Sequence, residues 1–290
     1  MKIPDYDLNQ HTDNLSRKTF RRFSAYIQSE LGIRMPETKM SMIQSRLQKR
    51  LRSLGINRFD DYCDYVFSAA GMQNEIDAMI DAVTTNKTDF FREPQHFNYL
   101  AMTLLPQIIN SSPQTSLTTI KVWSAGCSTG EEPYTLAMVL NEAQARFNEL
   151  CYSVLATDVS SGVLHTAIAG IYDHEKAKPI PMRLRKKYLL RSKDGQKNLI
   201  RMTPQLRACV NFRQANLMKD DLGIKELMDI IFCRNVIIYF ARPIQEKVLN
   251  RLCCHLNPGG FLFIGHSETL SGMNVPLTQV ESTIYQKRVL

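Results

Sequence analysis

The segment 120–134, IKVWSAGCSTGEEPY, restricts the fold more than any other part of the chain. An apolar run from Ile120 to Trp123 ends in small residues at 124–130, and a helical pattern begins at Pro133. A strand, a glycine-containing turn and a helix, in this order, form the first βα unit of a nucleotide-binding doubly wound sheet. We therefore predict an α/β fold with a doubly wound parallel sheet.

The two carboxylates that follow this turn, Glu131 and Glu132, indicate the kind of ligand that the helix start receives. Small residues let the backbone approach a ligand closely, and the first N–H groups of a helix are unpaired. Carboxylates at this position suit a ligand with a positive charge or with hydroxyls, and they fit poorly against a pyrophosphate. This favours S-adenosylmethionine (SAM) over NAD.

The same turn is compatible with other functions. Residues 126–130 also read G-x-S-x-G, the nucleophile elbow of α/β-hydrolases, with Ser128 as the nucleophile. A hydrolase needs strands and an oxyanion-hole loop before the elbow, whereas the first 110 residues look almost wholly helical. The pattern G-x-G-x-x-G is absent because Ser128 and Glu131 stand where glycines belong. From these residues SAM binding is favoured, while a hydrolase, another cofactor or a structural turn remain alternatives.

Composition places the chain among soluble intracellular proteins. Hydrophobic residues make up 44% of the 290 residues, and no stretch approaches 18 uninterrupted apolar residues. The first residues are polar and lack the apolar core of a secretory signal. The seven cysteines form neither a disulfide framework nor a C-x-x-C site. We expect a cytoplasmic protein with buried thiols, no bound metal and no direct membrane insertion.

Positive charge is concentrated near the amino terminus. Residues 17–58 contain eleven Lys or Arg and two Glu, a net charge of +9, whereas the whole chain carries +8. Apolar residues from Met40 to Leu54 recur at helical spacing and mark a buried face. The basic residues on the neighbouring face are Lys39, Arg46, Lys49 and Arg50. This face is either a solvated helix surface or a landing site for an acidic partner, and the lack of interleaved aromatic residues argues against nucleic acid.

The periodicity divides the chain into two domains and an insertion. We expect residues 1–15 to be poorly ordered, 16–85 to form a helical domain, 86–119 to be a linker segment with a helix, and 120–290 to form the sheet domain. The expected helices of the first domain span 16–31, 37–54, 59–70 and 73–85. In the second, strands are expected at 120–124, 152–157, 229–234, 261–265 and 282–288, and helices at 131–148, 160–170 and 243–256. A basic stretch, 172–213, interrupts this alternation, with a hairpin turn expected at Asp194-Gly195, and predicts an inserted antiparallel β-subdomain.

Polar residues follow several of the expected strands. Asp158 follows the apolar run 154–156, Asn216-Leu217 follows Phe212, and Arg234-Asn235 follows the apolar run 230–233. Ligands of doubly wound sheets bind beyond the carboxyl ends of the strands, where an acidic residue typically receives ribose hydroxyls. Asp158 could instead be a helix cap, and Asn216 an ordinary turn residue. Arg234 directly after an apolar run requires a specific partner.

Several motifs together closely resemble the chemotaxis receptor glutamate methyltransferases, the CheR family. They are TTNKTDFFRE at 84–93, WSAGCSTGEEPY at 123–134, ATDVS at 156–160, CRNVIIYF at 233–240 and GGFLFIGHSETL at 259–270. The resemblance runs from about residue 16 to the end, and Cys127 is a mild departure from the smaller residues expected there. It implies a helical domain, a SAM-binding domain and a small inserted β-subdomain.

The resemblance also implies the roles of individual residues. The residues expected to bind SAM and its product S-adenosylhomocysteine (SAH) are Asn86, Thr88, Arg92, Glu131, Asp158, Asn216, Leu217, Arg234 and Asn235. Of the two neighbouring glutamates, Glu131 is favoured over Glu132. Arg92 and Tyr239 match positions beside the transferred methyl group. The implied reaction is O-methylation of glutamate side chains on the cytoplasmic helices of chemoreceptors. A glutamate carboxylate is ionised at pH 7, since its reference pKa is about 4.3, so the reaction needs no general base.

The expected partners follow from the same resemblance. The basic residues Lys39, Arg46, Lys49 and Arg50 are expected to bind the acidic receptor helices, and the edge of the inserted subdomain a receptor carboxyl-terminal tail. We expect a monomer that binds no nucleic acid. The alternative is a non-catalytic, SAM-sensing adaptor of the same fold.

Overall fold

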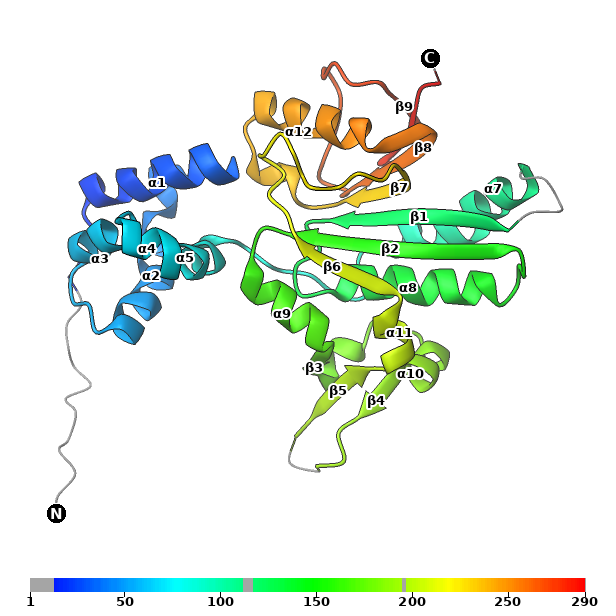
Figure 1. Cartoon of the computed structure of the whole chain (residues 1–290), viewed down its shortest axis with the longest axis horizontal. Helices are drawn as coiled ribbons and strands as arrows, with labels where there is room; N and C mark the ends of the chain where they lie inside the picture. Colours follow the sequence, from blue (N-terminus) through cyan, green and yellow to red (C-terminus); the bar gives the residue numbers. More distant parts are fainter. Residues whose placement is uncertain (1–12, 112–116, 195–196, 290) are drawn as a thin grey trace. The chain divides into compact units, whose positions relative to one another are not determined.

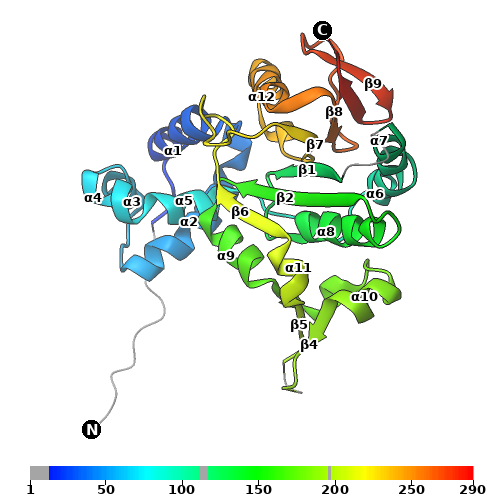
Figure 2. The same ribbon diagram turned by 45° about the vertical axis from the view of Figure 1, so that its right-hand side comes forward.

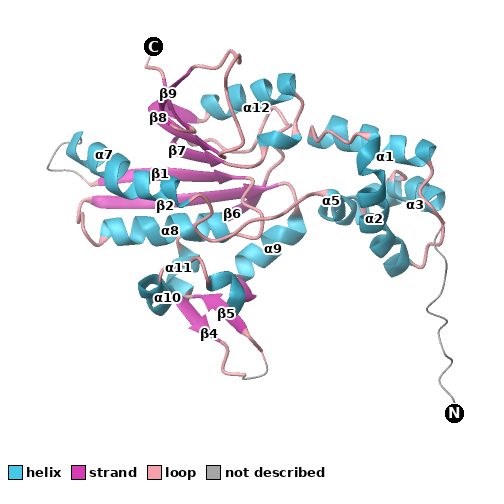
Figure 3. Cartoon of the chain, turned by 180° about the vertical axis from the view of Figure 1, so that it is seen from behind, coloured by secondary structure: helices cyan, strands magenta, loops and turns pink. Residues whose placement is uncertain are grey.

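The computed structural model describes residues 13–111, 117–194 and 197–289, and these belong to two compact units (Figure 1). The division falls between Thr85 and Asn86. Figure 3 shows helices in the first unit and alternating strands and helices in the second. Within the described ranges, no helix is both long enough and apolar enough to cross a membrane.

The first unit is built from amphipathic helices whose apolar faces form its core. The elements are α1 (Arg17–Leu31), η1 (Glu37–Lys39), α2 (Met40–Leu54), α3 (Phe59–Val66), α4 (Ala69–Asn74) and α5 (Ile76–Val83). Phe23, Ile27, Leu47 and Leu51 are fully buried. The two helices expected at 59–70 and 73–85 are in fact three, because the Ser68 hydroxyl accepts the N–H of Gly71 and starts a new helix.

Part of the amino-terminal segment is ordered, contrary to our expectation for residues 1–15. The backbone N–H of Asp13 donates to the Asn57 carbonyl (3.2 Å), and Leu15 is buried. Leu15 also donates its N–H to the Gln44 side chain (3.1 Å). Residues 1–12 lie outside the described residues.

The second unit contains the predicted sheet domain. Its helical elements are α6 (Pro94–Tyr99), η2 (Leu100–Leu104), α7 (Leu105–Ser111), α8 (Glu131–Gln144), α9 (Ser161–Ala169), η3 (His174–Ala177), α10 (Met182–Tyr188), α11 (Pro204–Ala208), η4 (Ile237–Tyr239) and α12 (Arg242–Cys254). Its strands are β1 (Thr118–Ala125), β2 (Leu150–Asp158), β3 (Ile171–Asp173), β4 (Leu189–Arg191), β5 (Leu199–Met202), β6 (Val210–Gln214), β7 (Met228–Cys233), β8 (Leu256–Ile264), β9 (Leu277–Glu281) and β10 (Ile284–Lys287).

The large sheet has seven strands in the order β6-β2-β1-β7-β8-β10-β9. The first five are parallel, and β10 pairs antiparallel with both β8 and β9. The chain runs outward from β1 through β2 to β6, then returns to β7 on the other side of β1. The strand order therefore reverses at β1 and β7, which is where doubly wound sheets bind ligands. The predicted doubly wound fold is confirmed.

The inserted subdomain is smaller than the sequence predicted. Strands β3, β5 and β4 form an antiparallel sheet of three, and Figure 2 shows this subdomain as a separate layer beyond α11. Residues 210–213, which we had assigned to the insertion, belong to β6 and pair with β2 in the large sheet. The strand was missed because its sequence, VNFRQ, is mostly exposed at the sheet edge and lacks an apolar run. Gly195 of the expected hairpin turn lies outside the described residues.

Candidate functional site

Parallel pairing brings five strand ends to one edge of the large sheet. The ends are Ala125 of β1, Asp158 of β2, Gln214 of β6, Cys233 of β7 and Ile264 of β8. The residues that follow them, including the turn 126–130, Asn216-Leu217 and Arg234-Asn235, therefore lie along the same edge. The convergence that we predicted for these segments follows from this topology.

The turn after β1 takes backbone conformations that favour glycine. Gly126 and Gly130 have φ of +81° and +96°. A Cβ on Gly126 would lie 2.5 Å from a methyl group of Val236, and one on Gly130 would lie 2.9 Å from the Cβ of Ala167. Both glycines are thus required by conformation and by close packing. The turn is tied to β2 because Gly126 N–H donates to the Thr157 carbonyl (2.8 Å).

Asp158 is buried at the end of β2 and receives two backbone N–H groups. Its Oδ2 accepts from Ser128 N–H (2.8 Å) and its Oδ1 accepts from Ser160 N–H (3.0 Å). Ser160, whose hydroxyl accepts from Val163 N–H, is the cap of α9. Since each carboxylate oxygen can accept more than one hydrogen bond, Asp158 is able both to hold the turn and to accept ligand hydroxyls.

The Ser128 hydroxyl does not have the surroundings of a nucleophile. Its Oγ donates to the main-chain carbonyl of Asn86 (2.9 Å), and Ser128 has a φ of +50°. A serine nucleophile needs an adjacent base that accepts its proton, and a peptide carbonyl does not do so. The bond instead joins the segment of Asn86 and Thr88 to the turn, which brings these two residues to the predicted site. The hydrolase alternative is not supported by this arrangement.

Glu131, the first residue of α8, is fully buried and accepts two hydrogen bonds. The Thr129 hydroxyl donates to Oε2 (2.6 Å), and the Lys176 ammonium pairs with Oε1. Lys176 belongs to η3 of the inserted subdomain, and its side chain is 41% exposed. A cation from the subdomain therefore occupies the carboxylate that we expect to bind the SAM ammonium.

Glu132 has different partners from Glu131. Its Oε1 accepts from the Ser124 hydroxyl (2.7 Å), and its Oε2 accepts from Nε of Arg234 (2.7 Å). The Arg234 side chain is 2% exposed and lies over the rings of Phe97 and Phe232, with 5.1 Å and 5.7 Å from its guanidinium carbon to the ring centres. Glu132 is thus the partner that the sequence required for the buried Arg234. The two neighbouring glutamates pair with different cations.

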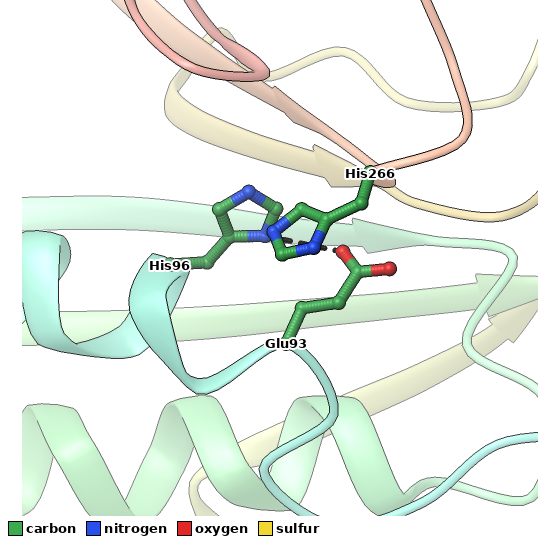
Figure 4. A group of neighbouring side chains, drawn as sticks. All are labelled: Glu93, His96 and His266. Carbon is green, nitrogen blue, oxygen red and sulfur yellow. Dashed lines mark ion pairs between the residues drawn. The ribbon is translucent and has the colours of Figure 1, made fainter.

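Glu93, His96 and His266 form a cluster of neighbouring side chains (Figure 4). The other end of the Arg234 guanidinium contacts two of them, Glu93 and His96. Potential ligand atoms of these three residues lie within 4.8 Å of one another, as in some metal sites. However, Arg234 Nη1 lies 2.9 Å from His96 Nδ1 and 3.3 Å from Glu93 Oε2. A divalent cation would have to lie beside this positive charge, so the cluster is a poor fit to a metal.

His96 is neutral in this environment. Burial, reinforced by the charge of Arg234, lowers the pKa of His96 to about 4. Since Arg234 donates to Nδ1, the remaining ring proton is assigned to Nε2, which donates to the Thr283 hydroxyl (2.8 Å). Burial alone would raise the pKa of Glu93, but Arg234 and the backbone of His266 bring it below the usual value.

The remaining predicted cofactor residues are placed by local contacts. Leu217 is buried, and Asn216 Oδ1 accepts from Met218 N–H (2.9 Å) in a turn beyond β6. Asn235 has a φ of +58°, and its N–H donates to the buried carboxylate of Glu268 (3.0 Å). Burial raises the pKa of Glu268, while backbone N–H groups, first that of Gly265, act against this rise.

The two residues predicted beside the methyl group are both half-buried. Arg92 Nη1 donates to the Lys87 carbonyl (3.1 Å), and the Arg92 carbonyl accepts from Arg234 Nη1 (2.8 Å). Tyr239 lies in η4, which follows β7. Both residues therefore belong to segments near the end of β7.

The predicted docking residues of the helical unit have mixed surroundings. Arg46 donates to the carbonyls of Val83 (2.7 Å) and Thr84 (2.8 Å). Arg50 makes a bidentate ion pair with the buried carboxylate of Glu75. Lys49 is exposed. Lys39 is half-buried, and burial lowers its pKa. Two of the four residues therefore stabilise the helical unit, whatever they contribute to docking.

Sequence reasoning missed Lys176, Glu93 and His96 as parts of this site. Glu93 and His96 follow the TDFFR motif by only a few residues, so their proximity to that motif was an available signal. Lys176 gave no signal, since it is one of many basic residues in the insertion. Its contact with Glu131 joins residues 45 positions apart.

Comparisons with known proteins match both units of the chain. The model described as the CheR methyltransferase SAM-binding domain matches residues 86–286, and that of the CheR methyltransferase all-alpha domain matches 18–84. The chain is 36% identical to chemotaxis protein methyltransferase 2 of Pseudomonas aeruginosa over 93% of each chain. It is 40% identical to the chemotaxis protein methyltransferase of Klebsiella aerogenes, over 93% of this chain and 90% of that one. The Escherichia coli K12 chemotaxis protein methyltransferase is 36% identical, with coverages of 93% and 91%.

Proposed function

Because the chain belongs to the CheR methyltransferase family, we propose that it transfers the methyl group of SAM to glutamate side chains of chemoreceptors. It is a SAM-dependent methyltransferase of chemotaxis. The products of the proposed reaction are glutamate 5-O-methyl esters and SAH. The observation that carries the proposal is the placement of two buried carboxylates, Glu131 and Asp158, at the edge where β1 and β2 end.

The residues at this edge fit SAM chemically. Asp158 would accept the ribose hydroxyls, and Glu131 the ammonium of the methionine part. Glu131 is favoured over Glu132 because its partner Lys176 is partly exposed and can give way, whereas Glu132 is paired with the buried Arg234. The other proposed contacts are Asn86, Thr88, Arg92, Asn216, Leu217, Arg234 and Asn235. When bound, SAM supplies a sulfonium methyl group that a carboxylate can attack.

The protein's part in this reaction is to position an ionised carboxylate. Arg92 would hold the substrate glutamate, and Tyr239 would shape the space beside the methyl group. A group that is already ionised at neutral pH needs no base, so orientation and exclusion of water are the main contributions. His96, which is buried and neutral, need not take part in proton transfer.

We further propose that the helical unit binds the acidic helices of the receptor. The basic stretch 17–58 would draw these helices in through long-range attraction, with Lys39, Arg46, Lys49 and Arg50 as contacts. The exposed edge strands of the inserted subdomain, β3 and β4, would allow a receptor tail to add a strand. We propose a cytoplasmic monomer with no affinity for nucleic acid.

The test is transfer of tritium from labelled SAM to purified receptor cytoplasmic fragments. The proposal expects incorporation that mild alkali releases as methanol, because a carboxyl ester is labile and an N-methyl group is not. SAH binding without transfer to any receptor fragment would instead support a SAM-sensing adaptor. Absence of SAH binding in calorimetry would overturn the assignment of the site.

A further inference from the structure

The backbone around Arg92 has a conformation that needs support from outside the segment. Phe91 and Glu93, on either side of Arg92, have φ of +53° and +56°. Residues with side chains seldom adopt this left-handed conformation, and surrounding contacts must hold them in it. Phe91 N–H donates to the Thr135 hydroxyl (3.2 Å), which fixes one side of the turn.

Arg234 fixes the other side. Its Nη1 donates to the Arg92 carbonyl (2.8 Å) and faces the side chains of Glu93 and His96 at 3.3 Å and 2.9 Å. Asn235 adds a bond from Nδ2 to Glu93 Oε1 (3.3 Å). The residues that immediately follow β7 thus hold the main chain and the neighbouring side chain of Arg92.

Arg234 is itself rigidly placed. Its Nε is bonded to Glu132 in the first turn of α8, and its flat guanidinium lies over Phe97 and Phe232. A lysine carries the same charge but cannot donate at both ends of a planar group or cover two rings in the same way. The geometry therefore depends on the guanidinium and not only on a positive charge.

We propose that the Arg234 side chain is a positioning residue for methyl transfer, which acts by holding Arg92 in place. This inference rests on the proposed function, because it takes the role of Arg92 from there. It concerns the bonds of the Arg234 guanidinium to the Arg92 segment and is separate from the contact with SAM proposed for Arg234. Glu93 and His96 are the acceptors that orient the guanidinium toward the Arg92 carbonyl.

A double-mutant cycle tests whether Arg234 acts through Arg92. The variants Arg234→Lys, Arg92→Ala and the double variant are compared by kcat/KM for methyl transfer to receptor fragments. We expect Arg234→Lys to lower kcat/KM at least tenfold in the wild-type background and less than twofold in the Arg92→Ala background. Equal losses in both backgrounds would overturn the proposal. Should Arg234→Lys fail to fold, Glu93→Gln replaces it, with an expected loss of at least threefold and the same non-additivity.

Hydrogen exchange of the backbone amides of residues 88–93 gives a second readout that does not depend on activity. Arg234→Lys should speed their exchange at least tenfold. The matched control is Thr283→Val, which removes the bond on the far side of the His96 ring and leaves every bond of Arg234 intact. Unchanged exchange in Arg234→Lys, or equal acceleration in the control, would overturn the proposal. A wild-type protein without transferase activity would refute the proposed function alone, and the exchange rates would still decide whether Arg234 holds this turn.

Discussion

Lys176 of the inserted subdomain is paired with Glu131, the first residue of α8 and the carboxylate proposed to bind the SAM ammonium. Glu131 is fully buried, whereas Lys176 remains partly exposed. In the proposed complex, two cations would compete for one buried carboxylate. Binding of the SAM ammonium at Glu131 would then loosen or share the contact with Lys176 and so couple the small subdomain to the site.

Lys176→Met should accordingly strengthen SAH binding. A partly exposed ion pair contributes less than about 1 kcal/mol, so we expect an increase of roughly two- to fivefold in affinity. Isothermal calorimetry with SAH measures this directly. Lys178→Met is the matched control, because Lys178 pairs only with its exposed neighbour Glu175 among the described salt bridges. Weaker binding in Lys176→Met would mean that the lysine supports the cofactor and does not compete with it.

Asp158→Ala should weaken SAH binding by about 1–3 kcal/mol, the scale of lost hydrogen bonds to a charged group. The substitution also removes the acceptor of the N–H groups of Ser128 and Ser160, so the turn after β1 loses support. Calorimetry gives the affinity, and the fluorescence of the single tryptophan, Trp123 in β1, reports whether this unit remains folded. Asp194→Ala, at the exposed ion pair with Lys197, serves as the control. Full affinity in folded Asp158→Ala would contradict the assigned ribose contact.

Charge reversal in the helical unit should separate docking from stability. Arg50→Glu places a second negative charge beside Glu75, which is buried and also accepts from the Tyr62 hydroxyl (2.9 Å). The Arg50 side chain is 30% exposed, so the pair is only partly buried. We expect loss of its hydrogen bonds to the Glu75 carboxylate to cost about 1–3 kcal/mol, which should lower the melting temperature of this unit in scanning calorimetry.

Lys49→Glu should behave differently, because Lys49 is exposed. We expect unchanged stability and SAH affinity, and a KM for receptor fragments that rises about two- to tenfold at low salt. The increase should shrink as salt screens the charges, since the Debye length is about 10 Å at 0.1 M. A KM that does not respond to Lys49→Glu at low salt would identify this face as a solvated helix surface.

The stability of the sheet unit should fall as the pH decreases from about 6.5 to 4. The folded state lowers the pKa of His96 to about 4, so between these values the unfolded chain binds the proton more readily. This stabilisation is complete above the pKa that His96 has in the unfolded chain. It is lost as the pH falls toward the pKa that His96 has in the folded protein. The loss attributable to His96 is on the order of 3 kcal/mol.

Urea unfolding followed by Trp123 fluorescence measures this dependence. His96→Asn, whose amide oxygen can still accept from Arg234, should reduce stability at neutral pH and flatten the slope between pH 6.5 and 4. Thr283→Val retains the titrating ring and should keep the slope. Identical slopes in His96→Asn and wild type would assign the effect to other groups, such as Glu93, whose lowered pKa acts in the same direction at lower pH.

The sequence alone determined the features that are encoded over short distances. The βα unit predicted at 120–134 is present as β1, the glycine turn and α8. The alternating pattern that follows predicted the ends of β2, β7 and β10 to within a few residues. It also predicted β8, although this strand begins earlier, at Leu256. The convergence of Asp158, the turn and Arg234 also followed from the sequence, because parallel strands must end at the same edge of a sheet.

Only the tertiary structure decided which partner each buried polar group has. Glu131 and Glu132 are adjacent in the chain, yet one pairs with Lys176 and the other with Arg234, more than 100 residues away. Likewise, Arg50 appeared as part of a basic surface, although its guanidinium is paired with the buried Glu75 of the same unit. Strand β6 escaped prediction because pairing with β2, and not its own apolar pattern, makes it a strand. Periodicity reports which face of an element is buried, whereas the partners of a charge depend on contacts between segments that are distant in the sequence.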